Sequence, residues 1–154
     1  MTNTDSLRTL IEPTHAGMAL PQSESAPTQL RGKRLRVVVA DDSPTFIEVL
    51  CALLQLDDQI DVVARVGNGA EAIETVAKLR PDAVLMDVDI PILDGLNAAM
   101  VISSRFPGTR IVLMSVFESS ELRADAQACG AVAFIDKTMF RDEFPQALGI
   151  PPAL

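Results

Sequence analysis

From residue 35 onward, the chain alternates five times between a short apolar run and a segment with the spacing of an amphipathic helix. The apolar runs are rich in β-branched residues, which is typical of strands that are buried on both faces of a parallel sheet. The runs that we expect to form strands are residues 35–40, 60–66, 82–87, 110–115 and 132–136. Because crossovers between parallel strands are right-handed, this order predicts an α/β fold with one five-stranded sheet and helices on both of its faces.

Capping residues and apolar spacing mark the helices between these runs. Ser43 as N-cap and Pro44 at the first helical position begin the first helix. The last helix begins near Met139 and is interrupted by Pro145, so we expect it to be short. The inner face of the first helix is predicted from its i, i+3, i+4, i+7, i+8 spacing to consist of Phe46, Val49, Leu50, Leu53 and Leu54.

The composition of the chain changes near residue 34. Residues 1–34 contain three prolines and many Ser and Thr residues without sustained periodicity, which predicts a flexible N-terminal extension. Residues 35–148 have the size of one ordinary domain with its own core. Residues 149–154 are then a short C-terminal tail.

Charge and cysteine usage exclude several classes of protein. The formal net charge of -8 argues against a nucleic-acid interface, which needs clustered Lys and Arg. No stretch approaches the ~18 apolar residues of a membrane span, and no secretory signal is evident. Cys51 and Cys129 lie far apart within helical patterns, as buried free thiols would. We therefore expect a cytoplasmic protein that neither binds nucleic acid nor inserts into a membrane.

Charged side chains follow three of the predicted strands. Asp41 and Asp42 come directly after the first strand, Asp87 ends the third, and Lys137 follows the fifth. The carboxyl ends of parallel strands are where ligands bind in open α/β sheets, so we expect these groups to converge. Carboxylates suit a hard divalent cation, and a lysine can neutralise phosphate oxygens. The pattern predicts a metal-assisted site that accepts a phosphoryl group.

Five landmarks in register over about a hundred residues carry a family resemblance. They are the pair Asp41-Asp42, the segment DVDIPILDG that begins at Asp87, Ser115 at the end of a strand, Lys137, and Phe134 three residues before it. The segment is close to the pattern D-x-x-M-P-x-M-D-G. From about residue 35 to 148, the chain resembles the CheY-like receiver domains of response regulators in two-component signalling. This resemblance implies a flavodoxin-like, doubly wound sheet with strand order 2-1-3-4-5.

The resemblance also implies a role for each matching residue. Asp87 would be the phospho-acceptor, while Lys137 and Ser115 would contact phosphate oxygens. Ser115 and Phe134 would move together in a two-state switch whose outer face recruits partners. The cofactor implied is Mg²⁺, and its expected ligands are Asp41, Asp42, Asp87 and the backbone carbonyl of Val88.

Some positions depart from the family pattern. Thr138 follows Lys137 where a proline is common, and Val116 follows Ser115 where Ala or Gly is usual. Asp89 and Phe117 occupy the two variable positions that flank the phosphate in receivers. We expect this pairing of a carboxylate and an aromatic ring to set the lifetime of the phosphorylated form.

The implied partners are a histidine kinase or histidine phosphotransfer protein as donor, and a downstream protein target that the sequence does not name. Little chain follows the fifth strand, which predicts a stand-alone receiver, with an excised part of a longer regulator as the alternative. A short last helix would expose apolar surface near the fourth and fifth elements, through which the protein could bind a partner or form a homodimer. Apart from its own phosphorylation and dephosphorylation, we do not expect an enzyme.

Two functions of other classes compete with this interpretation. A pseudo-receiver would keep the fold and bind partners without phosphorylation, and Val116 and Thr138 are the positions that favour it. A haloacid-dehalogenase-like phosphatase would use Asp87 and Asp89 as a D-x-D motif. That family places the motif near its first strand and needs a longer chain, which disfavours this reading.

Overall fold

In the computed structural model, residues 33–150 are described, and they contain one parallel sheet with the strand order β2-β1-β3-β4-β5. The predicted fold and strand order are therefore confirmed. The strands are β1 (Leu35–Ala40), β2 (Ile60–Val66), β3 (Ala83–Asp87), β4 (Arg110–Ser115) and β5 (Ala133–Asp136). The helices between and after them are α3 (Pro44–Gln55), α4 (Gly69–Leu79), α5 (Gly95–Arg105), α6 (Ser120–Ala128) and α7 (Phe140–Ala147).

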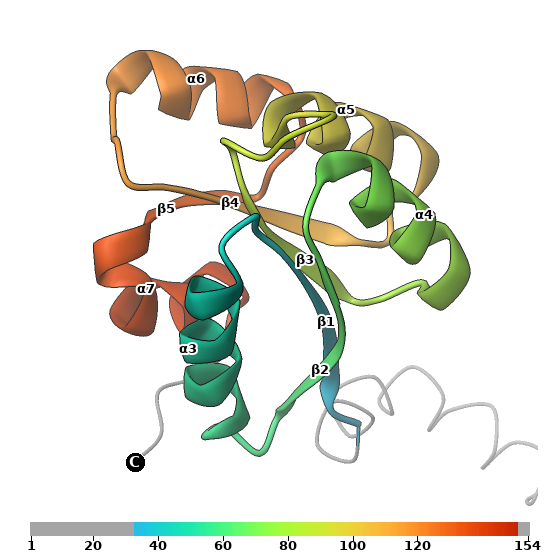
Figure 1. The fold of residues 1–154 in the computed structure, drawn as a ribbon, viewed down its shortest axis with the longest axis vertical. Coiled ribbons are helices and arrows are strands. Elements are labelled where there is room, and N and C mark those ends of the chain that lie inside the picture. Colours follow the sequence, from blue (N-terminus) through green and yellow to red (C-terminus); the bar gives the residue numbers. More distant parts are fainter. Residues whose placement is uncertain (1–32, 151–154) are drawn as a thin grey trace, which may run out of the picture. The chain divides into compact units, whose positions relative to one another are not determined.

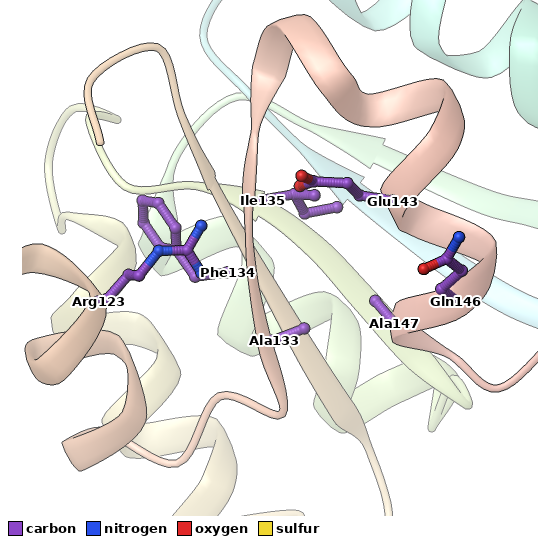
Figure 2. A pocket seen from close by; sticks show the side chains of 7 residues that line it. All are labelled: Arg123, Ala133, Phe134, Ile135, Glu143, Gln146 and Ala147. Carbon is purple, nitrogen blue, oxygen red and sulfur yellow. The ribbon is translucent and has the colours of Figure 1, made fainter. Parts of the chain in front are cut away.

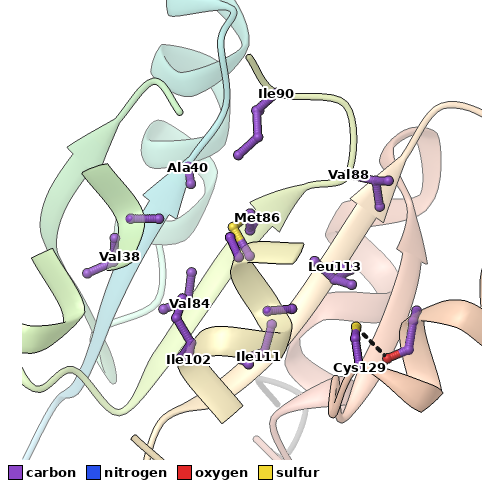
Figure 3. Close-up of a cluster of buried hydrophobic side chains, with 14 of the residues drawn as sticks. Val38, Ala40, Val84, Met86, Val88, Ile90, Ile102, Ile111, Leu113 and Cys129 are labelled. Carbon is purple, nitrogen blue, oxygen red and sulfur yellow. Dashed lines mark hydrogen bonds between the residues drawn. The ribbon is translucent and has the colours of Figure 1, made fainter. Parts of the chain in front are cut away.

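The helices cover the sheet as two layers (Figure 1): α3 and α7 lie on one face, and α4, α5 and α6 lie on the other. The alternation of side chains along each strand builds a separate core for each layer. In β1, Val38 and Ala40 join the core beneath α4, α5 and α6, whereas Val37 and Val39 join the core beneath α3 and α7. Figure 3 shows the first of these cores, where aliphatic side chains of the central strands meet Ile102 of α5. Burial on both faces explains why the central strands are mostly apolar.

The third and fifth strands each begin one residue later than predicted, at Ala83 and Ala133. Asp82 lies just before β3, and its Oδ2 accepts a hydrogen bond from the backbone N–H of Arg36 at 2.8 Å. After β5, a single turn of 3₁₀-helix (Lys137–Met139) precedes α7. The side chain of Asp136 caps this turn by accepting from Thr138 N at 2.8 Å. Ser43 and Ser119 are the N-caps of α3 and α6.

The last helix is short, as predicted. α7 has eight residues and contains Pro145, which cannot donate a backbone hydrogen bond within the helix. Its buried Phe140 and Phe144 stack with a centroid distance of 5.1 Å and hold the helix against the sheet. Their burial compensates for the weakened backbone ladder.

One prediction for α3 was wrong. Val49 was expected on the inner face but is 54% exposed. Leu50, Cys51 and Leu54 are the buried residues of the helix. At about 100° per residue, Val49 lies roughly 140° around the helix from Leu54, which turns it away from the sheet.

Two further predictions concern parts of the chain that are only partly described. The flexible extension, residues 1–34, lies outside the described residues except for its last two, and so does most of the tail after residue 148. The division at residues 34 and 148 therefore stays a prediction. Among the described helices, none is long and apolar enough to cross a membrane.

Candidate functional site

The carboxyl ends of four strands bring together the charged and hydroxyl groups that the sequence singled out. Asp41 follows β1, Asp87 is the last residue of β3, Ser115 is the last of β4, and Lys137 follows β5 by one residue. Strands β1, β3, β4 and β5 are neighbours in the sheet, so their ends meet at one edge. The strand order alone therefore brings these four residues to the same end of the sheet.

Lys137 joins two carboxylates into one ion-paired cluster. Its Nζ lies 2.7 Å from Oδ2 of Asp87, to which it donates a hydrogen bond, and 2.6 Å from Oδ2 of Asp41. The side chain of Lys137 is 12% exposed, that of Asp87 is 8% exposed, and that of Asp41 is fully buried. One ammonium group therefore faces two buried carboxylates, and the cluster keeps an excess of negative charge.

The second oxygen of each carboxylate is held by the backbone. Oδ1 of Asp41 accepts from Ser43 N at 2.8 Å, and Oδ1 of Asp87 accepts from Asp89 N at 3.1 Å. Each bond spans two residues at the start of a loop, an Asx-turn geometry that fixes the side chain relative to its strand. The carboxylates therefore stand in defined orientations before any phosphate donor arrives.

Burial and charge shift the pKa values of the two central groups. Burial is the largest influence on Asp87 and raises the pKa of its carboxyl above the ordinary value, against the opposing hydrogen bond from Lys137. The nearby charge of Asp41 raises it further. For Lys137, burial lowers the pKa, but the hydrogen bonds and charges of Asp41 and Asp87 outweigh it, so the pKa is raised. Lys137 thus stays a cation, and Asp87 is a more basic carboxylate than usual.

Three carboxylates at this edge fit a divalent cation. One ligand oxygen from each of Asp41, Asp42 and Asp87 lies within 4.8 Å of the others. Oδ2 of Asp41 is buried and accepts no hydrogen bond of good geometry, although Lys137 lies beside it. A hard ion such as Mg²⁺ takes carboxylate oxygens and keeps several waters, which suits a site with Asp42 exposed to solvent.

The backbone carbonyl of Val88 is engaged elsewhere. It accepts a hydrogen bond from Gly95 N at 2.9 Å, which uses one of its two lone pairs. This contact presses the loop after β3 against the start of α5, where a Cβ on Gly95 would come within 2.3 Å of the carbonyl oxygen of Asp87. The role of Val88 as a metal ligand stays a prediction, for which the second lone pair of the carbonyl remains.

Ser115 and Phe134 are the residues predicted to form a two-state switch, and that role stays a prediction. Oγ of Ser115 is buried and accepts from Phe117 N at 3.1 Å. Because the hydroxyl acts there as acceptor, its proton remains available for donation. Phe134 is buried in the core, and the guanidinium of Arg123 on α6 lies 5.4 Å from its ring centroid (Figure 2). Arg123 is itself paired with Glu118 of the loop after β4.

The two predicted rate-tuning residues are both exposed. Phe117 is 76% exposed in the loop after β4, and Asp89 is exposed in the loop after β3. The backbone N–H of Asp89 donates to Oδ1 of Asp87, so the main chain of Asp89 is attached to the site.

Phe46 is a residue of the site that the sequence did not identify as such. Its ring lies against Lys137, with Nζ 4.3 Å from the ring centroid. The helical spacing identified Phe46 only as part of the inner face of α3. Its place on the first turn after the Asp41-Asp42 pair was the one signal that could have connected it to the site.

Comparisons with known proteins agree with this geometry. The family model for the response regulator receiver domain matches residues 37–149. The chain is 34% identical over 114 residues to the transcriptional regulatory protein LnrK of Bacillus subtilis, covering 74% of this chain and 52% of LnrK. It is 40% identical over 105 residues to protein-glutamate methylesterase/protein-glutamine glutaminase 3 of Myxococcus xanthus, covering 67% of this chain and 30% of that protein. The chain thus spans about half or less of the length of these relatives.

Solved structures show the same similarity. The signal receiver domain of NarL from Mycobacterium tuberculosis superposes with a TM-score of 0.72 at 33% identity, covering 75% of this chain and 94% of that one. The response regulator domain of Thermotoga maritima CheB gives a TM-score of 0.69 at 28% identity, covering 78% of this chain and all of that one. The motifs, the strand order and the matched residues lead to one conclusion: this chain belongs to the response regulator receiver domain family.

Proposed function

We propose that this receiver domain accepts a phosphoryl group on Asp87, with Mg²⁺ held by Asp41, Asp42 and Asp87, and thereby changes its binding to a partner protein. The observation that supports this most directly is the position of the Asp87 carboxylate. Asp87 ends the central strand β3, and its carboxylate lies 2.7 Å from the Lys137 ammonium. The carboxylates of Asp41 and Asp42 are close enough to bind one metal ion together with it.

The reaction is a displacement at phosphorus. A carboxylate oxygen of Asp87 attacks the phosphorus of the donor and forms a new O–P bond. The bond from phosphorus to the donor's nitrogen or oxygen breaks, and its electron pair leaves with the imidazole of a phosphohistidine or with acetate from acetyl phosphate. When bound, Mg²⁺ neutralises charge on the transferring oxygens.

The chain's own groups perform the remaining tasks. Formation of the acyl phosphate removes the negative charge from the Asp87 carboxyl oxygens, so the Lys137 ammonium can donate to a phosphoryl oxygen instead. Ser115 can donate its hydroxyl proton to another oxygen while it still accepts from Phe117 N. The ion pair between Asp41 and Lys137 remains, and it keeps the ammonium group of Lys137 at the site.

The donor is expected to be a cytoplasmic histidine kinase or histidine phosphotransfer protein, in a two-component pathway.

We propose that the partner protein that receives the signal binds the face formed by α6, β5 and α7. This face carries a pocket of about 360 Å³ that is lined by Arg123, Ala133, Phe134, Ile135, Glu143, Gln146 and Ala147 (Figure 2). Phe134 connects this surface to the core beneath Ser115, so movement of its ring would alter the surface that a target or a second copy contacts. That the chain works as a stand-alone receiver stays a prediction.

Intact mass spectrometry tests the phosphorylation. After incubation with acetyl phosphate and Mg²⁺, the protein should gain one phosphoryl group, and neither an Asp87→Asn variant nor a Mg²⁺-free sample should gain it. If wild-type protein gains no phosphoryl group and also binds no beryllofluoride, the pseudo-receiver interpretation is the better one.

The exposed pair Asp89 and Phe117 is expected to control how fast the acyl phosphate is hydrolysed. Phe117→Ala removes an apolar group that is 76% exposed, and Asp89→Asn removes a charge, so both should change access of the attacking water. We expect the half-life of the phosphorylated form to change several-fold in each variant. The measurement is loss of the phosphoryl adduct with time after the donor is removed. Unchanged half-lives in both variants would contradict this role.

A further inference from the structure

We propose that Phe46 is a positioning residue for Lys137: its ring holds the ammonium group at the site while the charge of Asp87 changes during phosphorylation. This inference rests on the proposed function of Asp87. It assigns a role in phosphoryl transfer to a residue of the first helix that belongs to none of the predicted site positions.

The geometry is that of a cation–π contact. Nζ of Lys137 lies 4.3 Å from the centroid of the Phe46 ring, well inside the ~6 Å range in which such contacts are attractive. The main chain of Phe46 is held at the start of α3, because its N–H donates to Oγ of Ser43, the N-cap, at 3.3 Å, and its side chain packs against the core beneath α3. The same N-cap residue donates its own N–H to Asp41. The ring and one carboxylate partner of Lys137 are thus attached to the same short segment.

The three neighbours of the ammonium group have different fates during the reaction. Before transfer, Nζ lies 2.6 Å from Asp41 and 2.7 Å from Asp87. Transfer converts the Asp87 carboxylate into an acyl phosphate, so the carboxyl group loses its charge and the negative charge now lies on the phosphoryl oxygens. The ring of Phe46 and the carboxylate of Asp41 do not change. While its partner changes from the carboxylate to a phosphoryl oxygen, a lysine on a flexible four-carbon stem would otherwise be able to turn toward water.

Phe46 also packs as an ordinary apolar residue at the edge of the core beneath α3. A test must therefore separate loss of packing from loss of the aromatic face. Phe46→Leu removes the π-face but keeps an apolar side chain, and Phe46→Tyr keeps the face. Phe106→Leu is a matched control, because Phe106 forms the same type of contact with Arg80, at 4.6 Å, beneath the C-terminus of α4.

The first readout is the rate of phosphoryl uptake from acetyl phosphate at saturating Mg²⁺. We expect Phe46→Leu to be slower by about tenfold, which is within the range of a desolvated cation–π contact. Phe46→Tyr and Phe106→Leu should remain within about twofold of wild type. Equal rates for Phe46→Leu and wild type, or equal losses for Leu and Tyr at position 46, would overturn the proposal.

The second readout does not need phosphorylation, and its main observation is made on wild-type protein. In the NMR spectrum of wild-type protein, the ε-methylene protons of Lys137 should be shifted upfield by the ring current of Phe46, and Phe46→Leu should remove the shift. An unshifted Lys137 in wild type would refute the contact. Failure of wild-type protein to take up phosphate, with the ring-current shift present, would refute the proposed function and with it any part for Phe46 in transfer.

Discussion

Lys137→Met is expected to destabilise the Mg²⁺-free protein by about 3 kcal/mol, because it leaves Asp41 and Asp87 buried without their cation. Chemical denaturation in EDTA measures this loss. Addition of Mg²⁺ should recover much of it, since the metal replaces the missing positive charge. Lys78→Met, a change at an exposed lysine of α4, should remain within about 0.5 kcal/mol of wild type.

The loss of stability caused by Lys137→Met should also depend on pH. Loss of the ammonium removes the contacts that hold the pKa of Asp87 down, so burial raises that pKa further above its ordinary value. A group whose pKa is higher in the folded than in the unfolded protein binds protons preferentially in the folded state. Stability of the variant should therefore improve as the pH falls through the folded pKa of Asp87. A deficit that is independent of both pH and Mg²⁺ would contradict the ion-paired cluster.

Removal of Mg²⁺ is expected to slow phosphoryl uptake by about a hundredfold or more, because the metal supplies several kcal/mol of charge stabilisation. Asp42→Asn should give a similar loss at low Mg²⁺ and recover in part as Mg²⁺ is raised, since it weakens metal binding and leaves Asp87 in place. The measurement is the rate of uptake from acetyl phosphate across a Mg²⁺ titration.

Asp82→Asn provides the control for this titration. Asp82 precedes β3, at the opposite end of the strand from Asp87, and its acceptor oxygen is kept in the amide. Its Mg²⁺ dependence should match that of wild type. If Asp42→Asn and Asp82→Asn respond to Mg²⁺ alike, the acidic cluster is not the metal site.

Apolar runs were sufficient to predict the strands, because both faces of the central strands are buried and these strands are therefore mostly apolar. The apolar pattern was less informative at the edges of elements. Val49 matched the helical spacing but points to solvent, since the buried arc of α3 is narrower than the pattern suggests. Asp82 was placed within a strand, and its side chain instead caps the backbone of Arg36.

For the site, too, some features could be predicted from the sequence and others could not. Strand ends explain why Asp41, Asp87 and Lys137 converge, and this could be inferred from their positions after apolar runs. That Lys137 contacts both carboxylates depends on side-chain direction, which spacing does not encode. The contact with Phe46 is harder still to foresee, because it joins the first turn of α3 to the end of β5. The hydrogen bond between Val88 and Gly95 lies within the DVDIPILDG segment, but the motif does not by itself show which backbone groups pair.

The central claim is that Asp87 itself carries the phosphoryl group, and borohydride reduction followed by peptide mapping tests it most directly. Hydride attacks the acyl carbon of an aspartyl phosphate, expels phosphate, and reduces the side chain to the alcohol of homoserine. After treatment with acetyl phosphate and Mg²⁺, we expect homoserine at position 87, and none when Mg²⁺ is omitted. Homoserine at Asp41, Asp42 or Asp89 with an unmodified Asp87 would contradict the account.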